Sequence, residues 1–212
     1  MTGASGSILG VRLLQALQQS GVESHLVMTE WAKRTLRIET DYSEQDVADL
    51  ATRVYRVDNQ AAAISSGSFR TDGMVVIPCS MNTVAAMAHG LSENLVTRAA
   101  DVTLKERKPL VVVPRETPLT LIHLRNLVTL TEAGARIVPP MPGFYNRPKD
   151  VDEVVWHIVA RVLDQLGIDN DLTRRWGPSE PAAPLDLAEL DASPRRLAHL
   201  PGGDRTDERD KP

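Results

Sequence analysis

The hydrophobic residues in the first 177 positions follow two alternating patterns. In one, a short apolar run rich in β-branched side chains recurs at residues 25–28, 74–77, 110–113 and 136–138. Such runs are typical of strands that are buried on both faces of a parallel sheet. In the other, apolar residues within 151–166 follow the spacing i, i+3, i+4, i+7. That spacing predicts an amphipathic helix.

Glycines mark the ends of the predicted helices. Gly21, Gly134 and Gly167 each stand where a helix should stop, in a position that favours positive φ. A strand follows the first two within a few residues. Alternation of strands and helices with short joints predicts an α/β fold, with a doubly wound, mostly parallel sheet and helices on both faces.

A glycine-rich segment over residues 3–7 precedes a predicted helix over residues 8–19. A loop of this kind normally follows a strand, but only Met1 and Thr2 stand before it. Two interpretations stay open: the first strand lies upstream of Met1, or the sheet lacks its first strand.

The composition narrows the class of protein. The 212 residues carry a formal charge of -4 without a basic block, so we expect no nucleic-acid partner. No apolar run approaches the ~18–20 residues of a membrane span, and the first residues contain no signal segment, so we expect a cytoplasmic protein without membrane contact. The single cysteine, Cys79, excludes an internal disulfide. The five histidines have no ligand-like spacing, so we expect no metal.

Residues 178–212 differ from the rest of the chain. They hold six of the 14 prolines, and little in them can bury a core. We therefore expect an α/β domain over residues 1–177, and a Pro/Asp-rich tail over residues 178–212 that is disordered or docked on a neighbouring subunit.

Small polar residues follow several predicted strands, at the edge where ligands bind in open α/β sheets. Residues 3–6 can present backbone N–H groups to a phosphate, or form a plain turn before a helix. Thr29 can cap the next helix, or also reach a ligand. Residues 78–83 can hold a phosphate or the polar edge of a planar ring, or form another capping cluster. Cys79 has no histidine close in sequence, which disfavours it as a nucleophile.

Charged residues offer further candidates. Arg98 and Lys105 are seven residues apart and are expected on one helical face, which either has a binding role or is a solvated basic face. Arg115 suits a phosphate and Glu116 can relay protons, or the two form a surface salt bridge. Arg161 lies at the edge of an apolar helical stripe, where it either reaches water or meets a buried anion.

A stiff loop follows the last predicted strand. Residues 139–143 contain three prolines and a glycine, and they lead to Phe144 and Tyr145. The loop can form an apolar, π-rich wall of a site, or a packed corner at a subunit contact.

Five segments together resemble the flavin prenyltransferase family of the UbiX type, which also includes the B subunits of hydroxyarylic acid decarboxylases. In chain order they are residues 3–6, 78–83, 98–107, 114–116 and 142–145. The resemblance covers about residues 2–177. It implies a flavodoxin-like or Rossmann-like sheet that binds FMN, a reaction without a metal, and a dodecamer with its sites at subunit contacts.

The resemblance also implies roles for individual residues. The following would surround the FMN: Gly3, Ala4, Ser5, Thr29, Ser80, Met81, Asn82, Thr83 and Arg115. The following would bind the dimethylallyl donor: Arg98, Lys105, Tyr145, Arg161 and Trp176. A smaller set would be catalytic: Ser5, Lys105, Glu116 and Tyr145.

In this family, the dimethylallyl group of dimethylallyl phosphate is attached to N5 of reduced FMN and then to C6. The product, prenylated FMN, serves a partner decarboxylase. One alternative is a non-catalytic FMN carrier or accessory subunit of an aromatic acid decarboxylase. Another is a flavin-dependent cysteine decarboxylase, whose motif residues 78–83 also resemble. That family relies on a histidine in the helix that matches residues 30–39, and this segment contains none.

Overall fold

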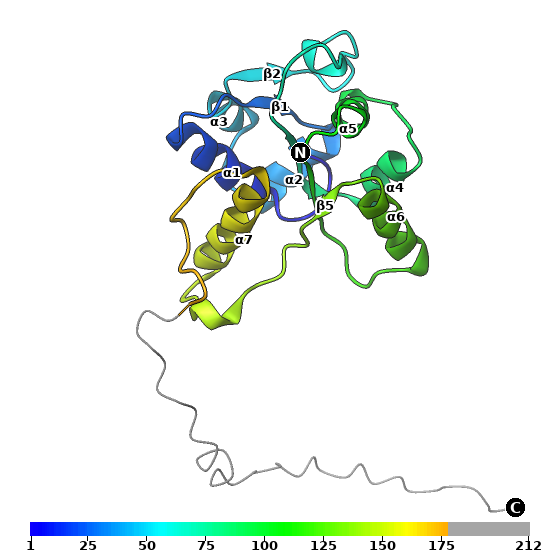
Figure 1. The fold of residues 1–212 in the computed structure, drawn as a ribbon. Coiled ribbons are helices and arrows are strands. Elements are labelled where there is room, and N and C mark those ends of the chain that lie inside the picture. Colours follow the sequence, from blue (N-terminus) through cyan, green and yellow to red (C-terminus); the bar gives the residue numbers. More distant parts are fainter. Residues whose placement is uncertain (178–212) are drawn as a thin grey trace, which may run out of the picture. The chain divides into compact units, whose positions relative to one another are not determined.

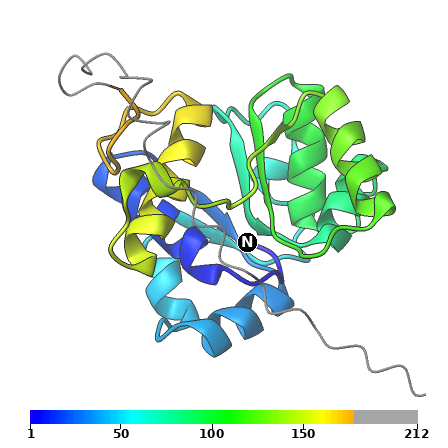
Figure 2. The ribbon, with the colours of Figure 1, turned by 90° about the horizontal axis from the view of Figure 1, so that it is seen from below.

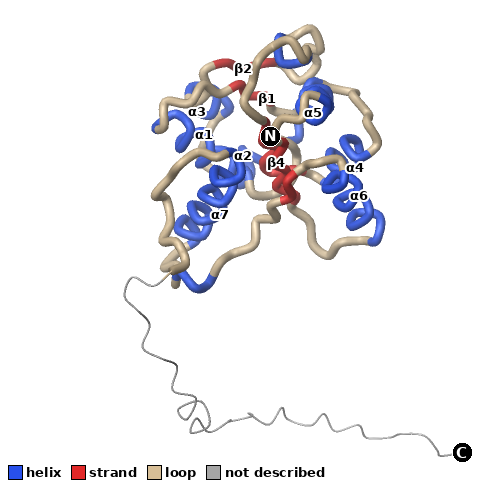
Figure 3. The backbone as a smooth tube through the Cα atoms, in the orientation of Figure 1, coloured by secondary structure: helices blue, strands red, loops and turns tan. Residues whose placement is uncertain are grey.

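Short parallel strands form the centre of the molecule. In the computed structural model, which describes residues 1–177, they are β1 (His25–Val27), β2 (Arg53–Tyr55), β3 (Met74–Cys79), β4 (Leu110–Pro114) and β5 (Arg136–Ile137). They pair as β1–β2 and as β3–β4–β5, and all these pairs are parallel. The predicted parallel α/β fold is confirmed, and Figure 3 shows the strands flanked by helices.

One strand was not predicted, and the ends of the other four differ from the predicted runs by one or two residues. β2 was not predicted, because Arg53 and Val54 are exposed and the strand carries no apolar run. β3 continues through Pro78 to Cys79, two residues beyond the predicted end of its apolar run. Its pairing with β4 is irregular between Val76 and Cys79.

The helices lie where the periodicity and the cap residues predicted most of them. They are α1 (Ser7–Gln19), α2 (Glu30–Glu39), α3 (Glu44–Asp49), α4 (Met81–Ala88), α5 (Leu95–Lys105), α6 (Leu121–Glu132) and α7 (Val151–Leu166), with two 3-10 turns, η1 (Ala63–Ser65) and η2 (Phe144–Asn146). The predicted positive φ is confirmed after three of them, at 67° for Gly21, 100° for Gly134 and 73° for Gly167.

Met1 and Thr2 connect the two groups of strands. The Met1 amine donates to the Val27 carbonyl at 2.8 Å, and the Thr2 N–H donates to the Pro78 carbonyl at 3.1 Å. The two residues therefore run between β1 and β3, in the place of the strand expected before the glycine-rich loop. With them, the order across the sheet is that of a Rossmann-type doubly wound fold.

Helices cover both faces of β3 and β4. Val112 belongs to a core cluster with residues of α4, α5 and α6, whereas Val111 and Val113 belong to a cluster with α1 and α7. Successive side chains of a strand point to opposite faces, so these clusters lie on the two sides of the sheet. Figures 1 and 2 show α1 and α7 on one side and α4 and α6 on the other. A third cluster packs α1, α2 and α3 around Leu26.

Residues 1–176 form one compact unit. None of the helices within residues 1–177 has both the length and the hydrophobicity to cross a bilayer. The predicted tail over residues 178–212 lies outside the described residues, so the division of the chain into a domain over residues 1–177 and a tail stays a prediction.

Candidate functional site

Three of the segments predicted to surround FMN meet at the carboxyl edge of the sheet. The Ser80 N–H donates to Thr2 Oγ1 at 2.8 Å, which ties the start of α4 to the residue before the glycine-rich loop. The Thr29 N–H donates to the Met1 carbonyl at 3.1 Å, and the Thr29 hydroxyl caps α2 by accepting the Ala32 N–H. Capping is therefore confirmed for Thr29, and its own O–H remains able to donate to a ligand.

The first residues of the loop leave no space for larger side chains. Gly3 packs so closely on Trp31 that a Cβ on Gly3 would collide with the Trp31 side chain. Ala4 is buried, and its N–H donates to the Thr2 carbonyl at 2.9 Å. The loop backbone is thus fixed against α2 from its first residues.

A carboxylate that we did not predict occupies the start of α1. The N–H groups of Gly6 and Ser7 both donate to Glu39 Oε2 at 2.9 Å, and the Ser5 side chain also hydrogen-bonds to this carboxylate. Gly6 adopts a φ of 101°, which an L side chain rarely allows, so the position favours glycine. Glu39 therefore holds the part of the loop that a phosphate would otherwise contact.

The environment of Glu39 favours its charged form. Partial burial raises the pKa of Glu39, but the hydrogen bonds from Ser5, Ser7 and Gly6 together outweigh it and lower the pKa below its usual value. The sequence did carry a signal for this residue. Glu39 is the last residue of α2, and an acid at a helix carboxyl end is unfavourable unless a partner from another element compensates it.

The start of α4 differs from the start of α1, because a hydroxyl and not a carboxylate caps it. Ser80 caps the helix by accepting the Thr83 N–H at 3.3 Å, its Oγ lies 3.0 Å from Thr83 Oγ1, and the first turn contains no acid. Met81 is buried and Asn82 is exposed, so the side chain of Met81 belongs to the core and that of Asn82 reaches the surface. Arg115 lies beside this helix start, because its N–H donates to the carbonyl at the end of β3 at 3.1 Å. Hydroxyls, helix N–H groups and a guanidinium together suit a phosphate.

Two alternatives for the residues after β3 and β4 can be tested: a salt bridge between Arg115 and Glu116, and a nucleophilic role for Cys79. Among residues 1–177, no ion pair joins Arg115 to Glu116, and Glu116 Oε1 instead accepts the Thr117 N–H at 3.0 Å. Cys79 is fully buried, and burial raises the pKa of its thiol to about 12. A thiol in this state is a poor nucleophile, as the sequence predicted.

The two basic residues of α5 share one face, as their spacing predicted. Arg98 Nε donates to the Ser65 carbonyl at 3.2 Å, and Lys105 Nζ would lie 2.7 Å from a Cβ on Gly67. Each cation also pairs with an acidic neighbour on its own segment, and each side chain stays partly exposed. Arg98 therefore faces the end of η1, and Lys105 faces the segment that follows it.

The predicted aromatic residues form a second group at η2 and α7. The rings of Tyr145 and Trp176 meet edge to face, with centroids 5.3 Å apart. Arg161 pairs with Asp164 at 2.6 Å, and Asp164 also binds Arg175, which directly precedes Trp176. Tyr145 and Trp176 are thus in direct contact, whereas Arg161 is connected to them only through Asp164 and Arg175, and its side chain is about half exposed.

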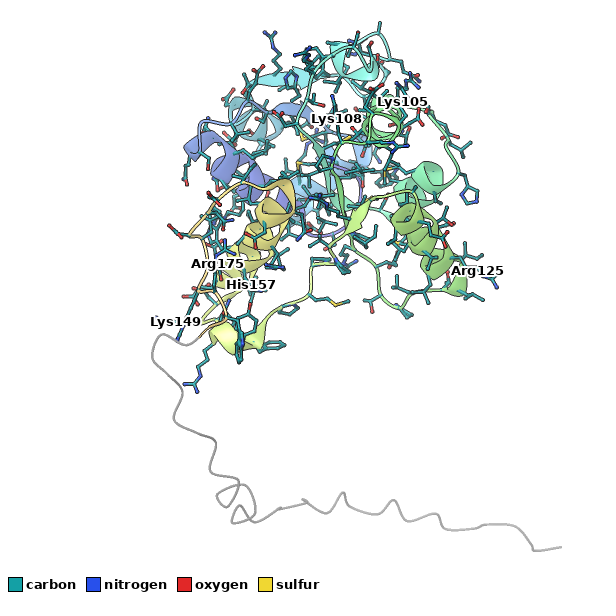
Figure 4. All side chains as sticks on the ribbon, viewed as in Figure 1. Lys105, Lys108, Arg125, Lys149, His157 and Arg175 are labelled. Atoms are coloured by element: carbon teal, nitrogen blue, oxygen red, sulfur yellow. The ribbon has the colours of Figure 1, made fainter. Side chains whose placement is uncertain are left out.

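One copy of the chain does not bring the two groups together. α5 packs on the face of the sheet that carries Val112, and α7 packs on the opposite face. Figure 4 shows Lys105 well away from His157 and Arg175. The predicted donor residues therefore converge on one cavity only if a second copy supplies part of the set.

Comparisons with known proteins agree with the geometry. A family model described as "Flavoprotein" matches residues 1–163. A probable UbiX-like flavin prenyltransferase from Escherichia coli O157:H7 is 58% identical over 83% of this chain and 90% of its own length. A dodecameric FMN-dependent UbiX-like decarboxylase from the same organism has a TM-score of 0.81 at 55% identity, covering 84% of this chain and 100% of its own. The structure of AnUbiX (PadA1) with FMN and dimethylallyl pyrophosphate has a TM-score of 0.83 at 48% identity, covering 85% and 96%.

Proposed function

The chain belongs to the UbiX-like flavin prenyltransferases of the flavoprotein family, and we propose that it transfers the dimethylallyl group of dimethylallyl phosphate to N5 and C6 of reduced FMN. The observation that carries this proposal is the meeting of the glycine-rich loop, Thr29 and the start of α4 at one sheet edge. It occurs in a chain that is 48% identical to a protein solved with FMN and dimethylallyl pyrophosphate.

The residues at this edge fit FMN, which is a substrate of the reaction. The hydroxyls of Ser80 and Thr83, the N–H groups of Met81 and Asn82, and the Arg115 side chain would hold its phosphate. The loop of Gly3, Ala4 and Ser5, together with Thr29, would line the flavin, because the residues before the loop hold Thr29 and the start of α4 at the same edge. Within residues 1–177, no cluster of three or more potential metal ligands occurs.

The cationic and aromatic side chains can stabilise the charges that develop when the allylic C–O bond of the donor breaks. As the allylic C–O bond opens, the phosphate takes the electron pair and positive charge develops on carbon. Arg98, Lys105 and Arg161 would stabilise the leaving phosphate, which fixed cations do best in a site without water. Tyr145 and Trp176 present edge-to-face rings, whose π-faces stabilise a nearby cation.

Two carboxylates can receive the protons that the flavin must lose at N5 and C6. Ser5 is hydrogen-bonded to Glu39, so a proton taken up by the serine hydroxyl can pass to a carboxylate behind it. Glu116 is exposed just after β4, next to Arg115, and would be the second proton acceptor. The released phosphate is a further base at the site.

A homo-oligomer, and by family a dodecamer, would complete the site at contacts between copies. The separation of α5 and α7 on opposite faces of the sheet supports this proposal. Leu121, Ile122 and Val128 of α6 are exposed apolar residues of the kind that subunit contacts cover. A decarboxylase that uses prenylated FMN is the proposed receiver of the product, and a cytoplasmic location stays a prediction from the sequence.

The test is an anaerobic reaction of purified protein with reduced FMN and dimethylallyl phosphate, with dimethylallyl pyrophosphate in parallel. Mass spectrometry should detect FMN enlarged by one dimethylallyl unit in at least one reaction. FMN that binds but stays unmodified with both donors would contradict the proposal and would favour the carrier instead.

A pair of lysines provides a matched control for the same assay. Lys105→Gln should slow turnover at subsaturating donor, because it removes a phosphate-stabilising charge. Lys108→Gln makes the same change three residues away, outside the proposed site, and should leave turnover unchanged; Figure 4 labels both side chains. Equal rates for the two variants would remove Lys105 from the site.

A further inference from the structure

A buried histidine lies beneath the aromatic pair. His157 of α7 is only 7% exposed, and a buried imidazole requires hydrogen-bond partners. Its Nδ1 lies 2.8 Å from Asn146 Nδ2 and 3.2 Å from Thr173 Oγ1, and Asn146 Nδ2 donates to Thr173 Oγ1 at 2.9 Å. These three residues, the His157 triad, connect η2, α7 and the segment after α7.

Tyr145 rests directly on this imidazole. The two ring centroids are 5.6 Å apart and the rings meet at 84°. Tyr145 also contacts Trp176, with ring centroids 5.3 Å apart and an interplanar angle of 86°. Trp176 is 81% exposed and Tyr145 is 46% exposed, so the only buried ring of the three is that of His157. The buried imidazole therefore supports the Tyr145 ring, and Tyr145 in turn contacts Trp176.

The backbone before Tyr145 is clamped against the same imidazole. A Cβ on Gly143 would lie 2.8 Å from His157 Nε2 and 3.1 Å from Tyr145 Cε1, closer than ordinary contacts allow. The segment from Gly143 to Asn146 thus touches His157 through its backbone, its tyrosine ring and its amide. A shift of the imidazole would move all three contacts.

Burial, with a smaller contribution from charge, favours the neutral form of the imidazole. Burial lowers the pKa of His157 below its usual value, and Arg161, one turn further along α7, lowers it again, while Asp164 acts in the opposite direction. A neutral ring retains an acceptor nitrogen, which a protonated ring lacks.

We propose that the His157 triad positions Tyr145 and Trp176 for the dimethylallyl donor. The inference rests on the proposed function, because it assigns the exposed rings to the donor. His157 does not touch the reacting atoms in this arrangement; it acts through Tyr145. Loss of the triad should weaken the use of the donor and leave the binding of FMN, at the start of α4, unchanged.

Three variants separate this role from general stability. His157→Phe keeps a ring and removes the hydrogen bonds, Thr173→Val removes one hydroxyl, and Thr173→Ser restores it. For the first two we expect kcat/KM for dimethylallyl phosphate to fall about tenfold, equivalent to about 1.4 kcal/mol, the net value of one hydrogen bond. Thr173→Ser should stay near the wild type, and the dissociation constant of FMN should be the same in all four proteins.

Donor binding to the protein with oxidised FMN, measured by calorimetry, adds a readout that needs no turnover. Wild-type protein that binds the donor but forms no product would refute the proposed function alone, and weaker donor binding by Thr173→Val would still support the triad. Unchanged donor binding and kinetics in Thr173→Val would overturn the inference, even if His157→Phe fails to fold. Parallel losses of donor and FMN affinity would also overturn it, since they indicate a structural role only.

Discussion

The two helix starts at the carboxyl edge of the sheet make opposite predictions for FMN binding. At α1, the Gly6 and Ser7 N–H groups already donate to the Glu39 carboxylate, so a second anion would meet a negative charge. At α4, the Ser80 hydroxyl accepts a long hydrogen bond of 3.3 Å from the Thr83 N–H, and its Oγ lies 3.0 Å from Thr83 Oγ1, so the proton of one of these two hydroxyls can turn to a phosphate. We therefore predict that the phosphate of FMN binds at α4, and that Ser80→Ala weakens it.

The size of the effect follows from the charge of the phosphate. A hydrogen bond to a charged group contributes about 1.5–3 kcal/mol, so removing the Ser80 hydroxyl should weaken FMN about ten- to hundredfold. The same substitution removes a helix cap, at a cost of about 1 kcal/mol in stability. Ser43→Ala is the matched control, because Ser43 caps α3 with a hydrogen bond of 3.1 Å from the Asp46 N–H.

Titration of flavin fluorescence with FMN and with riboflavin separates the phosphate from the ring. Ser80→Ala should lose FMN affinity and keep its riboflavin affinity, whereas Ser43→Ala should keep both. Glu39→Gln tests the competing location, because neutralising Glu39 would strengthen FMN if the phosphate lay at α1. An FMN-to-riboflavin affinity ratio that is unchanged in Ser80→Ala and raised in Glu39→Gln would refute the assignment.

Two further predictions concern stability, both measured by urea unfolding. Leu36→Ala should lower the free energy of unfolding by about 2–5 kcal/mol, since Leu36 is fully buried in α2. Ile38 lies two residues later and is 83% exposed, so Ile38→Ala should change the free energy of unfolding by less than about 0.5 kcal/mol. Similar losses for both variants would contradict the packing. The second concerns His157, whose pKa in the folded chain is lowered by burial and by Arg161. As the pH drops below about 6.5, the unfolded chain therefore takes up a proton at His157 before the folded chain does, and the free energy of unfolding falls from its value at pH 7. His157→Phe should reduce that fall.

Strands were predictable where burial fixed their sequence. β3 and β4 are buried, and their apolar runs marked them. β2 pairs with β1, and its residues Arg53 and Val54 are exposed, so β2 has no apolar run. A short strand with only one partly buried side chain, that of Tyr55, leaves no periodic signal in its residues.

The candidate site was predictable as a set of residues and not as a geometry. Caps at Thr29 and Ser80 follow from local sequence, since a cap bonds within three residues of itself. Glu39 meets the loop across 32 residues of chain, and His157 meets Thr173 across a turn of irregular structure. Contacts of this kind depend on how helices pack, and residue type alone does not specify their partners.

The sheet itself explains why the predicted residues form two groups. Lys105 ends α5, which packs on the face that carries Val112, and Arg161 belongs to α7, which packs on the face that carries Val111 and Val113. Because successive side chains of β4 point to opposite faces, the layers that hold these two cations are separated by the sheet in every copy of the chain. We therefore propose that a reaction that uses both cations on one phosphate draws them from two copies. For this reason we expect assembly to be a requirement of the chemistry.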